Sequence, residues 1–342
     1  MPPFLLSKGK IVQNLHLTGL LRRPEAGAFL GLLFVFIFFT IFGSTQFLAP
    51  AGASSWLNVA ANLGVIAIPI GLLMIAGELD VSIGSMIPAG SMTVAIISGY
   101  FGLPIWLGIA ATLTLGLVVG LINGILVIRT AVPSLIVTLG TLFAVAGLTL
   151  GLSVMLTGST SVAIASSGVA KLIFGSFINN TFQVMIFWWL GLTAIYIFVV
   201  HFSPWGNWIF ALGGDKISAR NAGIPTEKLT IALFVVSSVS AAFVGMCQAI
   251  LFNSAQVSAG SAFIFNAIIS VVVGGVLLTG GFGSIIGIFF GTITFAVVNQ
   301  GIYFTAFDRN LSSLIIGVML LLAVLMNNTF RRMALSYSSK KK

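Results

Sequence analysis

Charged residues are scarce in this sequence. Among its 342 residues there are only 15 Lys and Arg and 6 Asp and Glu, so charge makes up 6% of the chain, where a soluble domain carries about 25%. This scarcity excludes an ordinary soluble domain. Hydrophobic residues make up 58% of the chain, and apolar runs of about 20 residues, the length of a membrane-spanning helix, recur throughout it. The composition predicts a membrane protein that crosses the bilayer many times.

Residues with metal-binding, redox or phosphate-binding chemistry are nearly absent. The single cysteine, Cys247, cannot form a disulfide within the chain and is interpreted as a small buried apolar residue. The two histidines, His16 and His201, have no second ligand near them in the sequence. No G-x-x-x-x-G-K-[ST] phosphate loop occurs. We therefore expect no metal and no cofactor, and if ATP drives this protein, another chain binds it.

The chain also lacks the groups that a membrane enzyme needs. Hydrolytic or metal chemistry in a bilayer requires titratable groups, or a nucleophile with a base, within the spans. The only carboxylates near the hydrocarbon are Glu78 and Asp80, which lie in one turn. An enzyme is therefore not expected. An ion-coupled secondary transporter of a small polar solute stays open as an alternative, because these two acids could hold its ion.

Ten apolar runs are candidate transmembrane helices. Their apolar residues do not alternate with a period of 2, which excludes a β-barrel. The first run, of about 20 residues, is too long for the h-region of a signal peptide. We predict an all-α, polytopic fold with one transmembrane domain at 27–328, preceded by a segment at 1–26 and followed by a basic tail at 329–342. The ten runs are 27–47, 58–77, 83–99, 103–128, 134–155, 183–200, 229–252, 262–278, 285–299 and 311–326.

Positive residues divide unequally between the two sides of this topology. With the N-terminus inside, 13 Lys and Arg are cytoplasmic and only Lys171 and Arg309 are outside. By the positive-inside rule both termini are then cytoplasmic. Because the positive residues lie along one membrane face, anionic lipid head groups are a sufficient partner for them, and no nucleic acid is expected.

The stretch 203–230 differs from the rest of the chain because it holds 5 of the charged residues. Asp215 is a candidate N-cap, and Gly223 followed by Pro225 ends a helix in the expected way. We predict a short helix over 216–222, lying on the cytoplasmic face. A solvated loop that only carries positive-inside charges is the alternative.

A second short connection, 77–82, separates two apolar runs by about five residues. We predict a tight cytoplasmic turn in which Gly77 and Gly84 permit close backbone approach. Asp80 or Ser82 is expected to cap the following helix. Pro133 and Ser134 are interpreted in the same way, as a proline at a helix start beside a hydroxyl cap. A direct contact of the 77–82 turn with a gate or a partner stays open.

A faint internal repeat occurs at an offset of 203 residues. It pairs Gly71 with Gly274, Gly77 with Gly280, Ile83 with Ile286 and Gly84 with Gly287, although matches of this kind also arise by chance among 39 glycines. The repeat predicts two similar hairpins on the same cytoplasmic side. The candidate turn and gate residues are Gly77, Glu78, Asp80, Ser82, Gly84, Gly280, Gly281, Gly283 and Ser284.

Polar residues inside the spans are few and carry no charge. Amides in lipid face the protein interior, where they hydrogen-bond neighbouring helices or contact a substrate. A path of amides, hydroxyls and aromatic rings without fixed charge suits a neutral polyhydroxylated solute better than an ion. The candidate substrate-path residues are Asn62, Asn123, Thr141, Gln248, Asn266 and Asn299.

The segments 77–86, 132–141, 210–224 and 271–287 carry four motifs. Together they resemble those of one family, the permeases of ribose-, xylose- and galactose-type sugar importers powered by ATP-binding cassettes. G-E-L-D-V-S-I-G-S-M at 77–86 is similar to the family's G-G-I-D-L-S-V-G-S, and V-P-S-L-I-V-T-L-G-T at 132–141 to its P-S-F-I-V-T-L-G-T. F-A-L-G-G-D-K-I-S-A-R-N-A-G-I at 210–224 and V-V-V-G-G-V-L-L-T-G-G-F-G-S-I-I-G at 271–287 follow in the family's order. Glu78 stands where the family has glycine, and Asp215 where it has asparagine.

The resemblance implies a permease subunit in the bacterial inner membrane that imports a monosaccharide or polyol. Its implied partners are a separate ABC ATPase, a periplasmic substrate-binding protein and a second permease copy, with substrate passing between helices at the dimer interface. A short coupling helix is implied to insert into a cleft of the ATPase. The implied coupling residues are Gly213, Gly214, Asp215, Lys216, Ala219, Arg220, Ala222 and Gly223.

Overall fold

The computed structural model of the chain describes residues 24–130, 132–166, 168–258, 260–308, 310, 314–315, 317–322 and 324–325. Over these residues the fold is helical with four very short strands, which confirms the predicted all-α class. Most of the expected N-terminal segment, the basic tail and much of the expected last span at 311–326 lie outside the described residues.

Eight helices in the described part of the chain are long and apolar enough to cross a membrane. Two of them are extended by a different helix type, because α4 continues as a π-helix, η2, and α13 ends in a 3-10 turn, η3. The eight are α2 (Pro24–Phe42), α3 (Pro50–Ile75), α4 (Ile83–Ala95) with η2 (Ile96–Tyr100), α5 (Ile105–Thr130), α6 (Ser134–Thr157), α8 (Met185–Phe202), α11 (Thr226–Phe252) and α13 (Ile285–Gly301) with η3 (Ile302–Phe304).

The expected span at 262–278 is wrong in length. The helix there, α12 (Ser261–Val273), has 13 residues, which gives about 20 Å against a hydrocarbon core of about 30 Å. It ends because Gly274 and Gly275 follow, the latter with a left-handed φ of 89°. The chain then runs without regular structure to α13. Thus α12 is a half-length helix, packed on α3, α4 and α13.

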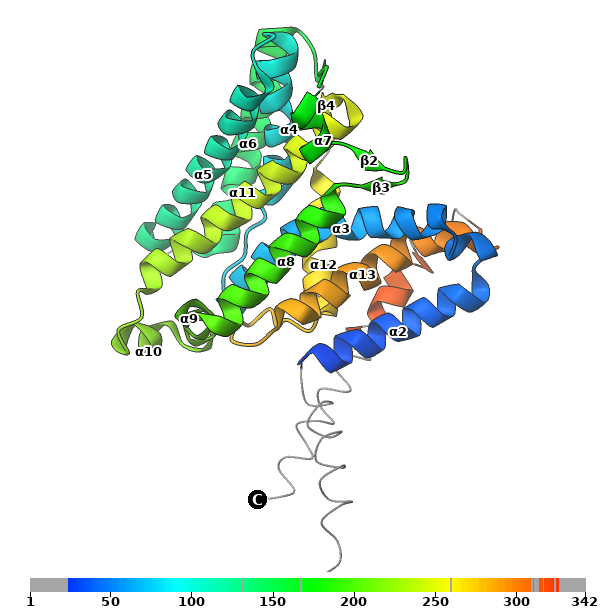
Figure 1. Cartoon of the computed structure of the whole chain (residues 1–342). Helices are drawn as coiled ribbons and strands as arrows, with labels where there is room; N and C mark the ends of the chain where they lie inside the picture. The colour runs from blue at the N-terminus through cyan, green and yellow to red at the C-terminus, as the bar shows by residue number, and fades with distance from the viewer. Residues whose placement is uncertain are drawn as a thin grey trace, which may run out of the picture.

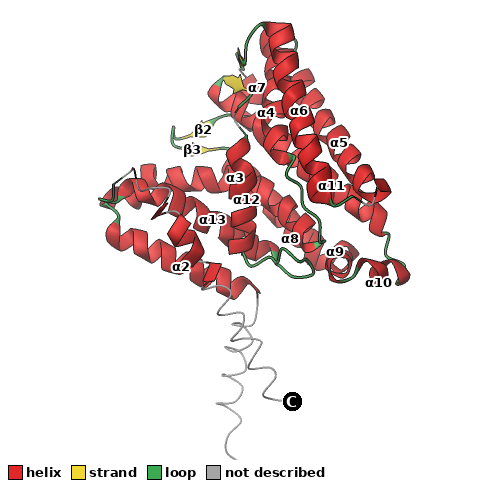
Figure 2. Ribbon diagram, turned by 180° about the vertical axis from the view of Figure 1, so that it is seen from behind, coloured by secondary structure: helices red, strands yellow, loops and turns green. Residues whose placement is uncertain are grey.

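The helices form two groups that lean against each other (Figures 1 and 2). One group contains α4, α5, α6 and α11, and the other contains α2, α3, α8, α12 and α13, with α3 and α11 in contact between them. Close packing of α5 on α11 depends on three glycines spaced by four residues, Gly116, Gly120 and Gly124. A Cβ on Gly120 would come 2.5 Å from the Cα of Val235, so small residues set this helix contact.

Short strands and helices lie at the two ends of the bundle. At one end, β1 (Ser161–Ala163) pairs with β4 (Ser254–Gln256), and β2 (Phe177–Ile178) pairs with β3 (Phe182–Gln183). Helix α7 (Gly168–Phe174) and the 3-10 turn η1 (Thr45–Phe47) lie in the connections there. At the other end are two short helices, α9 (Pro204–Gly214) and α10 (Lys216–Asn221).

The connection from α3 to α4 is not the tight turn that the sequence predicts. After Gly77, with φ of 83°, the chain has no helical structure until Ile83, and Asp80 and Ser82 are buried. In Figure 1 this segment is the light-blue loop between the two helices. Its backbone is satisfied by α6, because Leu79 N–H donates to Ser134 Oγ at 3.0 Å and Val81 N–H donates to Thr138 Oγ1 at 3.3 Å. Side-chain hydroxyls thereby stabilise extended backbone inside the bundle.

Candidate functional site

Six carboxamide side chains from five elements surround one cavity, which we call the amide cavity. Its volume is about 180 Å³. The amides come from α3, β3, α11, α12 and α13, and apolar side chains, three of them phenylalanines, complete the wall. The lining amides are Asn58, Asn62, Gln183, Gln248, Asn266 and Asn299, and the apolar residues are Val59, Leu63, Phe252, Phe263 and Phe295.

Asn62 is the central member of this set. Its Nδ2 donates both to Gln183 Oε1, at 2.7 Å, and to the carbonyl of Asn58 one turn earlier, at 2.8 Å. Its Oδ1 accepts from Gln248 Nε2 at 3.4 Å. Both donors of Asn62 are therefore used within the protein, and the residue links α3 to β3 and α11 at the cavity wall.

Several amide atoms at the cavity have no hydrogen-bond partner among the residues that the structure describes. Gln183 Nε2, Gln248 Oε1 and Asn299 Nδ2 are such atoms, and Asn266 uses neither atom of its side-chain amide. Donors and acceptors are both present in this unpaired set. The cavity therefore offers both kinds of partner to a bound polar molecule, and no charged residue lines it in the described structure.

The structure divides the six predicted substrate-path residues into two groups. Asn62, Gln248, Asn266 and Asn299 line the amide cavity together. Asn123 and Thr141 are not among the residues that line it. Sequence reasoning missed Asn58 and Gln183, although each is the first residue of a predicted span, and a carboxamide at a span boundary is the signal that could have identified them.

Asn123 belongs instead to a buried polar network around Asp80. Thr141 Oγ1 donates to Asn123 Oδ1 at 2.6 Å, and Asn123 Nδ2 donates to Ser82 Oγ at 2.9 Å. Ser82 donates to Asp80 Oδ1 through both its N–H and its hydroxyl, and Ser237 Oγ donates to Oδ2 at 2.8 Å. The network connects the 77–82 segment to α5, α6 and α11.

Asp80 does not cap α4 in the way that the sequence predicts. Ser82 is the N-cap residue and its side chain makes no cap bond, while the Asp80 carboxylate accepts from Ser82 and Ser237. Burial raises the pKa of the Asp80 carboxyl, and these hydrogen bonds oppose that rise. Both carboxylate oxygens are thus engaged by the protein, with neither at the amide cavity.

A second constellation lies at the end of the bundle that carries α9 and α10, which we call the turn end. Three segments meet there, 77–82, 213–224 and 274–284. Gly77 and Gly280 have the same left-handed backbone, with φ of 83° and 82°, and a Cβ on Gly280 would come 3.0 Å from Gly77 Cα. Gly281 N–H donates to the carbonyl of Ile75, the last residue of α3, at 2.8 Å.

The remaining predicted turn residues lie at or near the starts of helices. Ser284 caps α13, because its Oγ accepts from Gly287 N–H at 3.4 Å, and the same hydroxyl donates to Glu25 Oε1 of α2 at 2.7 Å. Gly283 packs against Ile75, and Gly84 lies beside Ile264 of α12.

The predicted helix at 216–222 is present as α10. Asp215 Oδ1 accepts from Ser218 N–H at 2.6 Å, which completes the N-cap and holds the pKa of the Asp215 carboxyl below its ordinary value. Ala222 is the C-cap and Gly223 follows with φ of 83°. The stretch also contains α9, which sequence reasoning missed, although Ser203 before Pro204 is a typical helix start.

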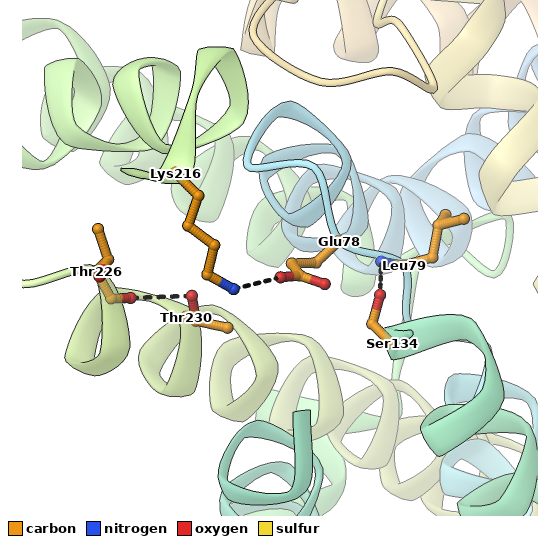
Figure 3. Close-up of polar contacts among 6 residues, drawn as sticks. All are labelled: Glu78, Leu79, Ser134, Lys216, Thr226 and Thr230. Carbon is orange, nitrogen blue, oxygen red and sulfur yellow. Dashed lines mark hydrogen bonds and ion pairs between the residues drawn. The ribbon is translucent and has the colours of Figure 1, made fainter. Parts of the chain in front are cut away.

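α10 contacts the 77–82 segment directly (Figure 3). Lys216 Nζ forms an ion pair with Glu78 Oε1 at 3.3 Å, one residue before Leu79, whose N–H bonds Ser134. The same view shows Thr230 Oγ1 of α11 donating to the carbonyl of Thr226 one turn earlier. Arg220 lies 3.8 Å from Glu227, and Ala219 is the buried residue of α10. α10 is therefore linked through its first residue to the segment that leads into α4.

Comparison with known proteins identifies the family. The family described as "Branched-chain amino acid transport system / permease component" matches residues 52–324. The inner membrane ABC transporter permease protein YjfF of Escherichia coli (strain K12) is 30% identical over 305 residues, 85% of this chain and 88% of its own. The autoinducer 2 import system permease protein LsrD of Enterobacter sp. (strain 638) is 29% identical over 266 residues, 77% of this chain and 80% of its own. No solved structure matches the chain.

Proposed function

The chain belongs to the family of the branched-chain amino acid transport system permease component, and on this premise we propose that its amide cavity passes a neutral polyhydroxylated solute, a monosaccharide or polyol. The chain is a permease subunit of an ATP-binding-cassette importer and a multi-pass protein of the inner membrane. It is a transport subunit and not an enzyme. We propose that this chain itself holds no cofactor and that ATP binds to the partner ATPase.

The set of unpaired amide atoms at the cavity carries the proposal. A hydroxyl group both donates and accepts, so a sugar needs neutral partners of both kinds. Gln183 Nε2 and Asn299 Nδ2 supply donors, Gln248 Oε1 supplies an acceptor, and Asn266 supplies both. The phenylalanine rings add apolar surface for the C–H face of a sugar ring.

The size of the cavity agrees with a small solute. Its volume of about 180 Å³ equals roughly six water molecules at about 30 Å³ each. This is below the range of about 300–1,000 Å³ that is typical of drug-sized ligands. A single monosaccharide or short polyol is the class that this volume and this lining favour.

An amino acid fits the lining less well, although the family description names one. Its ammonium and carboxylate groups would both have to leave water, and a buried charge needs an opposite charge or many hydrogen bonds. The described residues that line the cavity include no charged side chain. An ion-coupled carrier is also disfavoured, because the two acids that could hold its ion already have partners. Asp80 accepts hydrogen bonds from Ser82 and Ser237, and Glu78 forms an ion pair with Lys216.

The turn end is the surface on which we propose that the ATPase acts. Ile217 on α10 is 73% exposed and is flanked by Lys216 and Arg220, so α10 presents one apolar side chain between two basic ones. From there α3 runs 13 residues, from Ile75 back to Asn62, a distance of about 20 Å. Closure of the ATPase would thus move the helix that carries two of the cavity amides. The binding protein and a second permease copy complete the proposed assembly.

The proposal is tested by uptake into proteoliposomes that hold this chain with its partner ATPase and binding protein. Labelled ribose, xylose, galactose, sorbitol and leucine are offered with and without ATP. We expect ATP-dependent uptake of at least one sugar or polyol and none of leucine. Uptake of leucine alone would contradict the solute class. Uptake by this chain without the ATPase, driven by a proton or sodium gradient, would contradict the importer.

A further inference from the structure

The hairpin formed by β2 and β3 holds one wall of the amide cavity. Five of the six cavity amides lie on helices, whereas Gln183 lies at the end of β3, two residues before α8 begins. Asn179 and Asn180 in the hairpin loop both have left-handed φ, 49° and 56°, as tight hairpins require. Phe177 at the base and Ile178 beside the loop are 42% and 39% exposed. The position of Gln183 therefore depends on what fixes this hairpin to the bundle.

One side chain of α3 fixes it. Asn58 Oδ1 accepts from the backbone N–H of Gln183 at 2.9 Å, and Asn58 Nδ2 donates to the backbone carbonyl of Thr181 at 3.0 Å. Alternate residues of a strand present their backbone groups to the same edge. The carboxamide of Asn58 therefore pairs with the open edge of β3 as the peptide group of another strand would.

The Gln183 side chain is held by the same face of α3. Asn62, one turn after Asn58, donates to Gln183 Oε1 at 2.7 Å, and residues four apart on a helix are neighbours. With its Oε1 bound to Asn62 and its backbone N–H bound to Asn58, the Gln183 side chain keeps one free donor group among the described contacts, Nε2, and the residue lines the cavity. A change at Asn58 would release the backbone and misdirect this donor.

We propose that Asn58 is a positioning residue for the transported solute, which acts by clamping the β2–β3 hairpin so that Gln183 Nε2 donates to a solute hydroxyl. The inference rests on the proposed function, because it takes the amide cavity to be the solute site. It places one determinant of solute specificity on the hairpin and not on a helix. Gln183 favours a solute that has a hydrogen-bond acceptor at one position, and Asn58 holds Gln183 where it can donate to that acceptor.

The test measures binding of the sugar or polyol that the wild-type importer takes up in the ribose, xylose, galactose and sorbitol panel. Equilibrium dialysis with the labelled solute gives its Kd for the permease–ATPase complex without binding protein. The variants are Asn58→Leu, Gln183→Leu and the double variant. Ser55→Ala on α3 is the control, because Ser55 Oγ bonds only the Gly52 carbonyl within its own helix.

Each single leucine variant is expected to weaken binding about tenfold, the loss of one good hydrogen bond. The double variant is expected to match the singles, since residues that act through one contact are not additive. Asn58→Asp, which keeps the acceptor for the Gln183 N–H, is expected to fall between wild type and Asn58→Leu. Ser55→Ala is expected to bind as wild type does.

Two results would overturn the inference separately from the proposed function. Wild-type Kd in Asn58→Leu, with weakened binding in Gln183→Leu, would show that the clamp does not position Gln183. An additive, about hundredfold loss in the double variant would show that Asn58 acts by another route. If Gln183→Leu and Asn266→Leu both bind as wild type does, the amide cavity is not the solute site, and the proposed function fails with the inference.

Discussion

The backbone of Gly213 at the end of α9 lies directly against the carbonyl of Ile75 at the end of α3. A Cβ on Gly213 would come 1.7 Å from Ile75 O and 2.6 Å from Gly281 N. Because both neighbours are backbone atoms that bond each other at 2.8 Å, neither can yield without breaking that bond. The end of α3, the end of α9 and the 274–284 segment thus meet at the carbonyl of Ile75.

Gly213→Ala should therefore separate α9 from α3. We expect a loss of about 1–3 kcal/mol in the free energy of unfolding, typical of overpacking, and reduced stimulation of the ATPase. Gly214→Ala is the matched control, because a Cβ there meets nothing within 4 Å. The checks are the thermal unfolding midpoint in detergent and ATP hydrolysis in the assembled importer. Equal behaviour of the two variants would refute the contact.

Asp215 should matter for its cap and not for its charge. Asp215→Ala removes the acceptor for Ser218 N–H and should destabilise α10 and lower ATPase stimulation, whereas Asp215→Asn should retain both, because asparagine caps as well as aspartate. The additional stabilisation from the ionised form of Asp215 is present above the ordinary aspartate pKa and is lost as pH falls through its lowered pKa, a pH dependence that Asp215→Asn should lack. An asparagine variant as defective as the alanine variant would point to the charge.

Asp80 should be a structural residue of the 77–82 segment. Asp80→Leu leaves the N–H of Ser82 and the hydroxyls of Ser82 and Ser237 without their acceptor, and each buried unpaired group costs about 1–3 kcal/mol. Asp80→Asn keeps one acceptor and should fold and transport with ATP. Thermal unfolding and ATP-driven uptake measure the two effects. A folded Asp80→Asn importer that no longer transports with ATP would contradict this role.

The ion pair between Lys216 and Glu78 should contribute little to stability. Half of the Lys216 side chain is exposed, 52%, against 14% for Glu78, and pairs of this kind contribute about 0–1 kcal/mol. A double-mutant cycle with Lys216→Ala and Glu78→Ala, followed by thermal unfolding at low and high salt, should give a coupling in this range that falls with salt. A coupling above about 2 kcal/mol that salt does not change would contradict the exposed geometry.

The sequence predicted those features that depend on residues close together along the chain. Apolar length identified the eight long helices, and Asp215 and Gly223 located the ends of α10. The extended 77–82 segment could not be predicted, because the hydroxyls that satisfy its backbone, Ser134 and Thr138, are more than 50 residues away. From the sequence alone, a segment this short between two apolar runs cannot be distinguished from a tight turn.

The candidate site shows the same division. Carboxamides within apolar spans marked four of the cavity residues, since amides in lipid seek polar partners. Whether such a partner is a solute or another side chain depends on packing between helices. Asn123 hydrogen-bonds Ser82 and Thr141, whereas Asn266 lines the cavity. The residues next to each asparagine in the sequence do not distinguish these two outcomes. Gln183 was missed because the side chain that fixes its backbone is Asn58, 125 residues earlier.

The most direct measurement is the number of solute molecules imported per ATP hydrolysed by Asn266→Leu in the reconstituted importer, with saturating loaded binding protein. Asn266 lines the cavity, whereas Phe265, its neighbour on α12, is 69% exposed and is not among the lining residues, so Phe265→Leu is the control. We predict that Asn266→Leu hydrolyses ATP at the wild-type rate but imports severalfold less sugar per ATP, while Phe265→Leu is unchanged. Wild-type import per ATP by Asn266→Leu would contradict the claim that the amide cavity carries the solute.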